Sequence, residues 1–182
     1  HLIQQGKILY WGTSKFHRDD LIKAWEFAEA NGLEGPIVEQ PPYNMIRRDA
    51  VDDNLQPLFE RYGMGTTVFS PLQGGILSGK YNDQMPDDNS RMLDERTPGF
   101  VRDRLDEASI NVSRKLAEVA HDLGCTQAQM ALAWVLKNPN VSTCITGAKR
   151  PQQVEENMKA LDVVEKLTDD VMKRIEDILA TL

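Results

Sequence analysis

The segment GTTVFSPLQGGILSGKY, residues 65–81, decides between the two common folds that alternate strands with helices. It begins with β-branched residues that favour a strand and continues into the adjacent glycines Gly74 and Gly75. An open doubly wound sheet usually carries the pattern GxGxxG at the start of a helix. Here the glycine pair leads into ILSGKY, and the strand nearest the start of the chain ends in WGTSKF. The sequence therefore favours half of an eight-stranded (β/α)8 barrel over an open α/β sheet.

Strand and helix patterns alternate along the whole chain, as they do in a parallel sheet covered by helices. We expect strands at residues 7–14, 35–40, 65–72 and 141–148. Apolar residues at helical spacing follow the first two strands, and these two helices are expected to stop at Gly32 and Gly63. Their predicted apolar faces consist of Leu21, Trp25 and Ala28 in the first helix and Leu55, Leu58, Phe59 and Tyr62 in the second.

A long polar loop, residues 82–102, is expected before the fourth strand and is followed by an amphipathic helix that includes Leu116. Thr126 and Gln129 form a capping-box pair in front of the apolar run MALAWVL, which predicts a buried helix. Two more helices are expected after the fourth strand. One begins at Pro151 with Val154, Met158 and Leu161 on one face, and the other begins at Thr168.

The composition is that of a folded protein and excludes several classes of function. Of 182 residues, 41% are hydrophobic and 27% are charged, which fits one domain or a large piece of one. The net charge of −7 argues against a general attraction to nucleic acid or anionic membrane. We see no membrane span or signal peptide and expect a cytoplasmic protein. Cys125 and Cys144 are expected to be buried free thiols.

Potential metal ligands do not have metal-binding spacing in this sequence. His1, His17 and His121 are far apart and are expected at the surface. A group of acidic residues in the polar loop, Asp87, Asp88 and Asp94, lacks the EF-hand pattern. We therefore predict no metal. Trp11, Trp25 and Trp134 are expected to pack in the structure and not to form a site.

Two segments carry groups that suit a phosphate ligand. Residues 70–80 combine adjacent glycines, which allow close approach of the backbone, with the mobile positive charge of Lys80. Residues 147–157 place Lys149 and Arg150 before a helix start, whose free N–H groups and dipole favour an anion. Each segment also has an ordinary interpretation, a simple turn in the first case and a solvated basic pair in the second.

Four motifs, in order, resemble the aldo-keto reductases, specifically those similar to the voltage-gated potassium-channel β-subunit. They are YWGTSKF, IVEQPPYNM, FSPLQGGILSGKY and ITGAKRPQQVEENMKALDVV, and together they extend over nearly the whole chain. The resemblance implies a (β/α)8 TIM barrel in which residues 1–182 supply the fifth to the eighth strands. It also implies that the N-terminal half of the barrel domain is absent from this sequence.

The resemblance implies NADPH (or NADP in its oxidised form) as cofactor and assigns residues to each of its parts. Ser14 and Gln40 match positions that bind the nicotinamide carboxamide, Phe69 matches the ring that stacks on the nicotinamide, and Lys15 replaces an asparagine of many relatives. The match to the loop around the pyrophosphate consists of Ser70, Pro71, Leu72, Gln73 and Gly74. Lys80 and Arg91 match groups that reach the phosphate and adenosine end. The match to the clamp on the 2′-phosphate and adenine consists of Gly147, Lys149, Gln153, Glu156 and Asn157.

Several of these residues have a structural alternative. Ser14 could cap a turn, Phe69 could be core, and Glu156 and Asn157 could lie on a polar helical face. Gln40 ends an apolar strand before Pro41 and Pro42, where a buried amide needs hydrogen-bond partners.

The resemblance implies a reductase of aldehydes or ketones, whose catalytic tyrosine, lysine, aspartate and histidine belong to the first four strand-helix units. None of Tyr10, Tyr43, Tyr62 and Tyr81 lies in the family's catalytic motif, so we predict no catalytic residue in this chain and no activity for it alone. Expected partners are a carbonyl substrate, the missing N-terminal half of the barrel and a homo-oligomer. The alternative is a regulatory channel β-subunit that binds a potassium channel and uses NADPH as a redox sensor.

Overall fold

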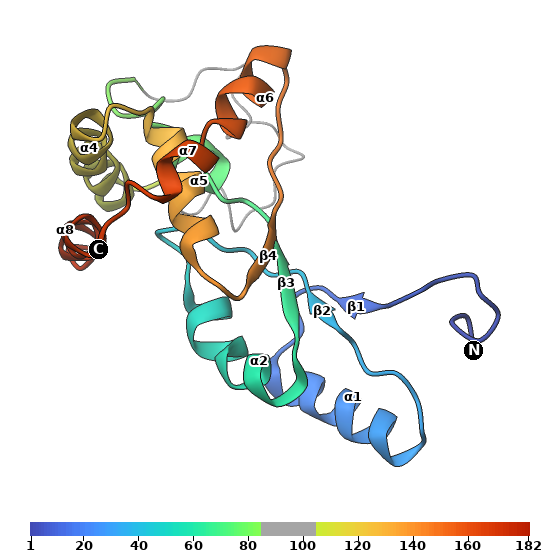
Figure 1. The fold of residues 1–182 in the computed structure, drawn as a ribbon. Helices are drawn as coiled ribbons and strands as arrows, with labels where there is room; N and C mark the ends of the chain where they lie inside the picture. Colours follow the sequence, from blue (N-terminus) through green and yellow to red (C-terminus); the bar gives the residue numbers. More distant parts are fainter. Residues whose placement is uncertain (85–104) are drawn as a thin grey trace. The chain divides into compact units, whose positions relative to one another are not determined.

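The computed structural model describes residues 1–84 and 105–182 (Figure 1). The chain divides into two units. Unit 1 contains the sheet and the first helices, and unit 2 contains the remaining helices. Unit 1 comprises His1–Tyr43, Arg47–Phe69 and Pro139–Ile145. Unit 2 comprises Asn44–Ile46, Ser70–Asn138 and Thr146–Leu182. Arg91, Asp87, Asp88, Asp94 and most of the predicted polar loop lie outside the described residues.

A parallel sheet forms the centre of unit 1, and its strands follow the chain order β1-β2-β3-β4. Gly12 of β1 pairs with Val38 of β2, and Val38 pairs with Gly65 of β3. Thr66 of β3 pairs with Val141 of β4, with an irregularity between Thr66 and Thr67. The bounds are Gly12–Thr13 for β1, Val38–Glu39 for β2, Gly65–Val68 for β3 and Val141–Cys144 for β4. The predicted α/β class and parallel sheet are confirmed.

The strands are shorter than the predicted segments, and prolines explain where β2 ends. Pro41 and Pro42 have no N–H group and cannot continue a regular ladder. The pairing goes on only as single contacts: the Phe69 N–H donates to the Pro41 carbonyl at 3.1 Å, and Pro42 forms an isolated bridge with Phe69. This register places the ends of β2 and β3 side by side.

Helices α1, Arg18–Ala30, and α2, Gln56–Tyr62, supply the apolar core of unit 1. A π-helical turn, η1 (Ala50–Leu55), leads directly into α2. The core cluster contains Leu21, Leu55, Leu58 and Met64, with Phe59, Tyr62 and Trp25 packed against it. Trp25 stacks on Tyr62 with 4.9 Å between ring centres. The predicted apolar faces of both helices are confirmed.

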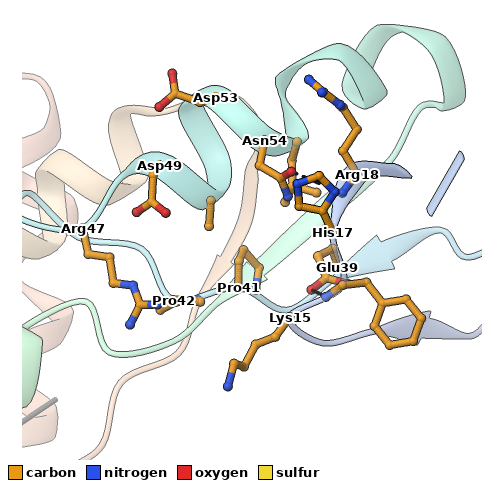
Figure 2. Close-up of a pocket in the computed structure, with 13 residues that line it drawn as sticks. Lys15, His17, Arg18, Glu39, Pro41, Pro42, Arg47, Asp49, Asp53 and Asn54 are labelled. Carbon is orange, nitrogen blue, oxygen red and sulfur yellow. Dashed lines mark hydrogen bonds between the residues drawn. The ribbon is translucent and has the colours of Figure 1, made fainter. Parts of the chain in front are cut away.

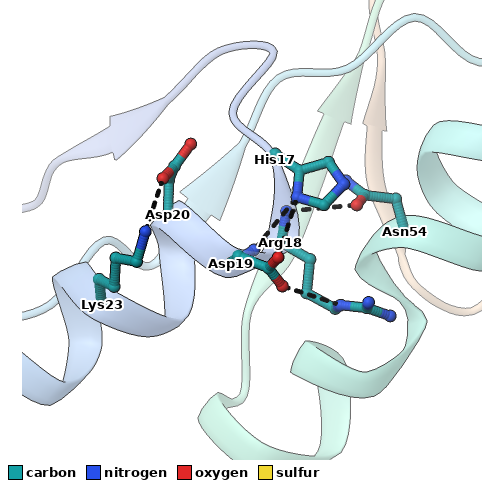
Figure 3. Close-up of polar contacts among 6 residues, drawn as sticks. All are labelled: His17, Arg18, Asp19, Asp20, Lys23 and Asn54. Carbon is teal, nitrogen blue, oxygen red and sulfur yellow. Dashed lines mark hydrogen bonds and ion pairs between the residues drawn. The ribbon is translucent and has the colours of Figure 1, made fainter.

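The ends of these two helices show how local sequence sets their length. Gly32 and Gly63 follow α1 and α2 in the left-handed conformation expected after a helix, with φ of 62° and 60°. At the start of α1, His17 Nδ1 accepts a hydrogen bond from the Asp19 N–H (Figure 3). The Arg18 N–H donates to the Asn54 side chain at 3.2 Å, which joins α1 to η1. His17 is thus an exposed capping residue.

Unit 2 is built from helices, with α5 at its centre. Helix α5, Gln127–Lys137, begins with the predicted capping box: the Gln129 N–H donates to Thr126 Oγ1 at 3.2 Å, and the Thr126 N–H donates to Gln129 Oε1 at 3.0 Å. Its residues from Met130 to Val135 are all buried, as predicted. The other elements are η2 (Gln73–Ser78), α4 (Glu107–Asp122), α6 (Pro151–Met158), α7 (Leu161–Val164) and α8 (Asp169–Leu179).

Helices α4 and α8 are joined at the surface by one close ion pair. Arg174 Nη1 lies 2.7 Å from Asp122 Oδ2. The hydrogen bond from Arg174 lowers the pKa of the Asp122 carboxyl below its usual range, although burial opposes the shift. Apolar packing adds to this contact, since Leu116 of α4 and Ile175 of α8 are both fully buried.

Three sequence predictions differ from the structure. Val154, Met158 and Leu161 do not form a buried face, because α6 ends at Met158 and their exposed fractions are 49%, 53% and 63%. Trp11 is exposed and donates through Nε1 to the Glu34 carbonyl at 2.8 Å. Cys125 and Cys144 are free thiols as predicted, but they are only partly buried. No helix among the described residues has the length and apolar character to cross a membrane.

Candidate functional site

Among the described residues of unit 2, left-handed backbone is concentrated in the segment Ser70–Gly75, which we call the glycine turn. Four of its six residues have left-handed φ values: 55° at Ser70, 46° at Gln73, 64° at Gly74 and 105° at Gly75. The Gln73 N–H closes the first bend on the Ser70 carbonyl at 3.0 Å. Glycine tolerates such values, whereas Ser70 and Gln73 carry strain that the surroundings must hold in place.

Asn44 holds these two strained residues. Its Nδ2 donates to the Ser70 carbonyl at 2.9 Å and to Gln73 Oε1 at 2.8 Å. Its Oδ1 accepts the Ile46 N–H at 3.0 Å, which fixes the orientation of the amide. Asn44 is 0% exposed and Gln73 is 1% exposed. The sequence reasoning missed Asn44, whose one available signal was an asparagine within the motif IVEQPPYNM.

Lys80 lies against the same turn. A β-carbon on residue 75 would meet Lys80 Cε and would stand 2.7 Å from Lys80 Nζ. The Nζ group is also 4.6 Å from the ring centre of Tyr81, a distance that suits a cation–π contact. The lack of a side chain at Gly75 therefore allows the Lys80 ammonium group to lie beside the glycine turn.

A polar network supports η2 and the residues that follow it. Ser113 Oγ lies 2.9 Å from the Ile76 carbonyl and 2.7 Å from Asn82 Oδ1. Gln127 Nε2 donates to Ser113 Oγ at 2.8 Å, and Asn82 Nδ2 donates to Gln127 Oε1 at 3.1 Å. The network joins α4 and α5 to the chain on both sides of Lys80. It also explains Gly79, because a β-carbon there would collide with Gln127 Oε1.

The start of α6 differs in one respect from the prediction. We expected free N–H groups at this helix start, but Gln153 Oε1 accepts the N–H groups of Lys149 at 2.8 Å and Arg150 at 3.2 Å. Gln153 thereby acts as a capping residue. The side chains of Lys149 and Arg150 are exposed, so their charges, not these two N–H groups, are what this segment offers an anion.

The remaining predicted residues of this segment lie around the same helix. Gly147 and Glu156 are exposed, and Asn157 is partly buried. The Glu156 carbonyl accepts a hydrogen bond from Gln129 Nε2 at 3.0 Å, which joins α6 to α5. Within unit 2 the structure thus provides two separate groups of predicted residues, one at the glycine turn and one at α6. In the first group Pro71 is buried and Leu72 is partly buried.

Unit 1 contains the residues that the resemblance assigns to the nicotinamide. Ser14 Oγ donates to the Gln40 carbonyl at 2.9 Å, a bond that joins the residues after β1 and β2. Gln40 is partly buried, and its Nε2 donates to Thr67 Oγ1 at 3.3 Å. Phe69 is also partly buried, and its carbonyl accepts the Tyr43 N–H at 3.1 Å. Ser14, Gln40 and Phe69 thus follow β1, β2 and β3, whose carboxyl ends share one edge of the sheet.

A pocket of about 520 Å³ lies beside this edge, within unit 1 (Figure 2). Lys15, with φ of 62°, is the one predicted cofactor residue in its lining. Arg18 and Arg47 bring further positive charge, which Asp49, Asp53 and Glu39 balance. Glu39 is 1% exposed, and its carboxylate accepts the Phe16 N–H at 3.0 Å and contacts the Thr13 hydroxyl. Both oxygens of this buried side chain therefore have hydrogen-bond partners within the protein.

The residues of unit 2 fit a phosphorylated cofactor on two structural grounds. Gly75 provides a place without a side chain beside a positively charged Lys80. The glycine turn also keeps Gly74 and Gly75 partly exposed while its strained ends are held from inside. Turns with left-handed residues can present N–H groups to an anion. Among the described residues, no cluster of histidine, cysteine, aspartate and glutamate suits a metal ion.

The sequence model of the aldo/keto reductase family matches residues 1–180, so this chain belongs to that family. Proteins of this family are typically NAD(P)H-dependent oxidoreductases. The predicted family is thus confirmed.

Three similar relatives bear the name voltage-gated potassium channel subunit beta. The relative from Schizosaccharomyces pombe is 42% identical over 180 residues, which cover 98% of this chain and 52% of the relative. The one from Arabidopsis thaliana is 41% identical over 98% of this chain and 55% of its own length. The one from Oryza sativa subsp. japonica is 40% identical, with shares of 98% and 54%. The chain spans about half the length of the curated relatives it matches.

Proposed function

We propose that this chain is the cofactor-binding part of a cytoplasmic, NADPH-dependent reductase of aldehydes and ketones. Its four strands would be the fifth to the eighth of a (β/α)8 barrel, and residues 1–182 would be the C-terminal part of a single domain. The observation that carries the proposal is the glycine turn with Lys80 held beside Gly75. Family membership and the order of the four motifs support it.

The proposal gives each group of residues one task. In unit 2, the glycine turn and Lys80 hold the pyrophosphate, and Lys149 attracts the 2′-phosphate, with Gln153, Glu156 and Asn157 beside the adenosine. In unit 1, Ser14 and Gln40 orient the carboxamide, and Phe69 covers one face of the nicotinamide. When bound, NADPH supplies the hydride that reduces the carbonyl carbon. This chain contributes binding, orientation and exclusion of water, while the proton donor belongs to the rest of the domain.

A second function is favoured by the names of the relatives. All three carry the name of a potassium channel β-subunit, at 40% to 42% identity. In this alternative the complete protein forms a homo-oligomer that binds a channel, and its NADPH reports the redox state. The alternative uses the same cofactor residues, so it differs from the first in the partner and not in the site.

Titration with NADPH and assay of turnover test the proposal on the complete protein. Saturable NADPH binding, followed by loss of NADPH absorbance when an aromatic aldehyde is added, is the expected result. Residues 1–182 alone should show no turnover. A complete protein that binds no NADPH would contradict both functions. Tight binding without turnover of any aldehyde or ketone, together with co-purification of a potassium channel, would favour the second function.

A further inference from the structure

Asn44 lies at the centre of the contacts that shape the glycine turn, although the resemblance assigns it no role. Its side-chain amide uses both of its hydrogens on this turn, one on the Ser70 carbonyl and one on Gln73 Oε1. Its oxygen is used by the Ile46 N–H. The two bonds from Nδ2 therefore fix residues 70 and 73, and the bond from Ile46 fixes the orientation of the amide.

Those two residues are the strained members of the turn. Ser70 and Gln73 adopt left-handed φ values of 55° and 46°, which side chains other than glycine rarely adopt. Such a conformation is unfavourable for a residue with a side chain and persists only where the surroundings over-determine it. Without the two hydrogen bonds from Asn44, relaxation toward ordinary φ values would move the backbone that leads to Gly74 and Gly75.

The Gln73 side chain gives a second indication that residue 73 is held in an unfavourable conformation. Its side chain is 1% exposed, and its Nε2 has no hydrogen-bond partner among the described residues. An unsatisfied buried donor is unfavourable, because it loses its hydrogen bonds to water without replacing them. The Asn44 amide donates to the oxygen of the same side chain and so fixes which end of the Gln73 amide is left unpaired.

We propose that Asn44 is a positioning residue that holds the glycine turn in the shape that binds the pyrophosphate of the cofactor. This proposal rests on the proposed function, since it concerns the same site. Asn44 is buried and touches the turn from inside, so it acts through Ser70 and Gln73 and not by contact with the ligand. The part of the cofactor that depends on this positioning is the diphosphate bridge, not the adenine or the nicotinamide.

Two fragments of the cofactor separate this role from a general loss of stability. 2′-Phospho-ADP-ribose contains the diphosphate bridge, whereas 2′,5′-ADP lacks it. In the complete protein, Asn44→Ala should weaken 2′-phospho-ADP-ribose about tenfold and 2′,5′-ADP less than about twofold, because only the first fragment uses the shape of the turn. Asn44→Asp keeps the oxygen that accepts the Ile46 N–H but lacks the N–H group that donates to Ser70 and Gln73. It should therefore also weaken 2′-phospho-ADP-ribose more than 2′,5′-ADP. Calorimetric titration measures both affinities.

Gln73→Gly, added to Asn44→Ala, keeps the test decisive even if the single Asn44 variants fail to fold. Glycine adopts the left-handed conformation of residue 73 readily and removes the unpaired amide, so the double variant should fold more readily than Asn44→Ala alone. It should still lose more affinity for 2′-phospho-ADP-ribose than for 2′,5′-ADP, because Ser70 lacks its contact with Asn44. A folded double variant that loses affinity for both fragments by the same factor would overturn the proposal, since the loss would then not concern the diphosphate bridge.

Further outcomes separate failure of the inference from failure of the proposed function. Equal losses for both fragments in a folded Asn44→Ala protein, or no loss for either, would overturn the positioning role while leaving cofactor binding intact. A wild-type protein that binds neither fragment would contradict the proposed function itself. Asn31→Ala is the matched control, because Asn31 is an exposed asparagine at the end of α1 whose side-chain amide donates to the nearby Phe27 carbonyl at 2.8 Å.

Discussion

Lys80 occupies the space beside Gly75 that a side chain on residue 75 would need. A β-carbon there would meet Lys80 Cε, and the φ of Gly75 is 105°, a value that L-residues rarely adopt. Both facts predict the same outcome for Gly75→Ala: the backbone is strained, and the ammonium group of Lys80 must move away. We expect NADPH to bind about tenfold more weakly to this variant in the complete protein, measured by titration.

Gly124→Ala serves as the control for that prediction. Gly124 also belongs to unit 2 and has a φ of 65°, but a β-carbon there would meet no atom within 4 Å. This variant should lose about 1 kcal/mol of stability and keep its affinity for NADPH. Equal weakening of NADPH binding in both variants would show that backbone strain alone, and not displacement of Lys80, is responsible.

Lys149 is predicted to favour NADPH over NADH. The 2′-phosphate is the charged group that NADH lacks, and Lys149 presents an exposed ammonium group next to the start of α6. Because Gln153 already occupies the two adjacent N–H groups, the lysine side chain is the main attraction left at this position. Lys149→Ala should weaken NADPH about tenfold at low salt, leave NADH nearly unchanged, and show a smaller effect as salt increases.

The control for Lys149 is Lys159→Ala, which removes an exposed charge at the far end of α6. Its effect should be small and equal for the two cofactors, since exposed charges of this kind contribute little. If Lys149→Ala reduces the affinity for NADPH and NADH by the same factor at one ionic strength, the 2′-phosphate contact belongs to Lys80 or Arg150 instead.

Structural features that depend on a few neighbouring residues could be predicted from the sequence. The capping box of Thr126 and Gln129, the helix ends at Gly32 and Gly63, and the buried α5 all depend on contacts within a few positions. Asn44 could not be predicted in this way. Its partners are 26 and 29 residues away, and only the folded chain brings them together.

The strand lengths and the apolar residues of α6 were mispredicted for a different reason. Periodicity shows which residues are apolar, but it does not show what covers them. Val154 and Met158 have the spacing of a buried face and are nevertheless about half exposed. Likewise, the predicted strand at residues 35–40 is longer than β2, and Pro36 within it lacks the N–H group that pairing requires. The roles of individual cofactor residues came from the resemblance and stay predictions.

Cys144 is predicted to resist alkylation in the folded protein. Burial raises the pKa of its thiol to about 11. Burial also raises the pKa of the Cys125 thiol, but the positive charge of Lys166 partly offsets that increase. A pKa about two units above the ordinary value leaves roughly a hundredfold less thiolate at pH 8. Iodoacetamide should therefore modify Cys144 slowly in the native protein and fast after denaturation, which peptide mass mapping can follow at each cysteine.

The same shift has a defined effect on stability. Because the folded pKa of Cys144 is raised, its contribution to stability is fully present below the pKa of the unfolded thiol and is lost as the pH rises through about 11. The free energy of unfolding should thus fall across alkaline pH, and Cys144→Ala should reduce the slope. A native protein in which Cys144 reacts as fast as a free cysteine at pH 8 would contradict the raised pKa.

Phe69 follows β3 and is only partly buried, so its replacement should affect binding more than folding. A fully buried phenylalanine costs about 3 to 5 kcal/mol when truncated to alanine, and a partly buried one should cost less, roughly 1 to 2 kcal/mol. If its ring covers the nicotinamide, Phe69→Ala should also weaken NADPH binding about tenfold and slow hydride transfer, because dispersion contact and shielding from water are lost.

Phe27→Ala is the control for Phe69→Ala, since Phe27 is 63% exposed on α1. Denaturant unfolding and NADPH titration of both variants measure the two effects separately. Unchanged affinity for NADPH together with a large fall in stability would assign Phe69 to the core and remove it from the cofactor site.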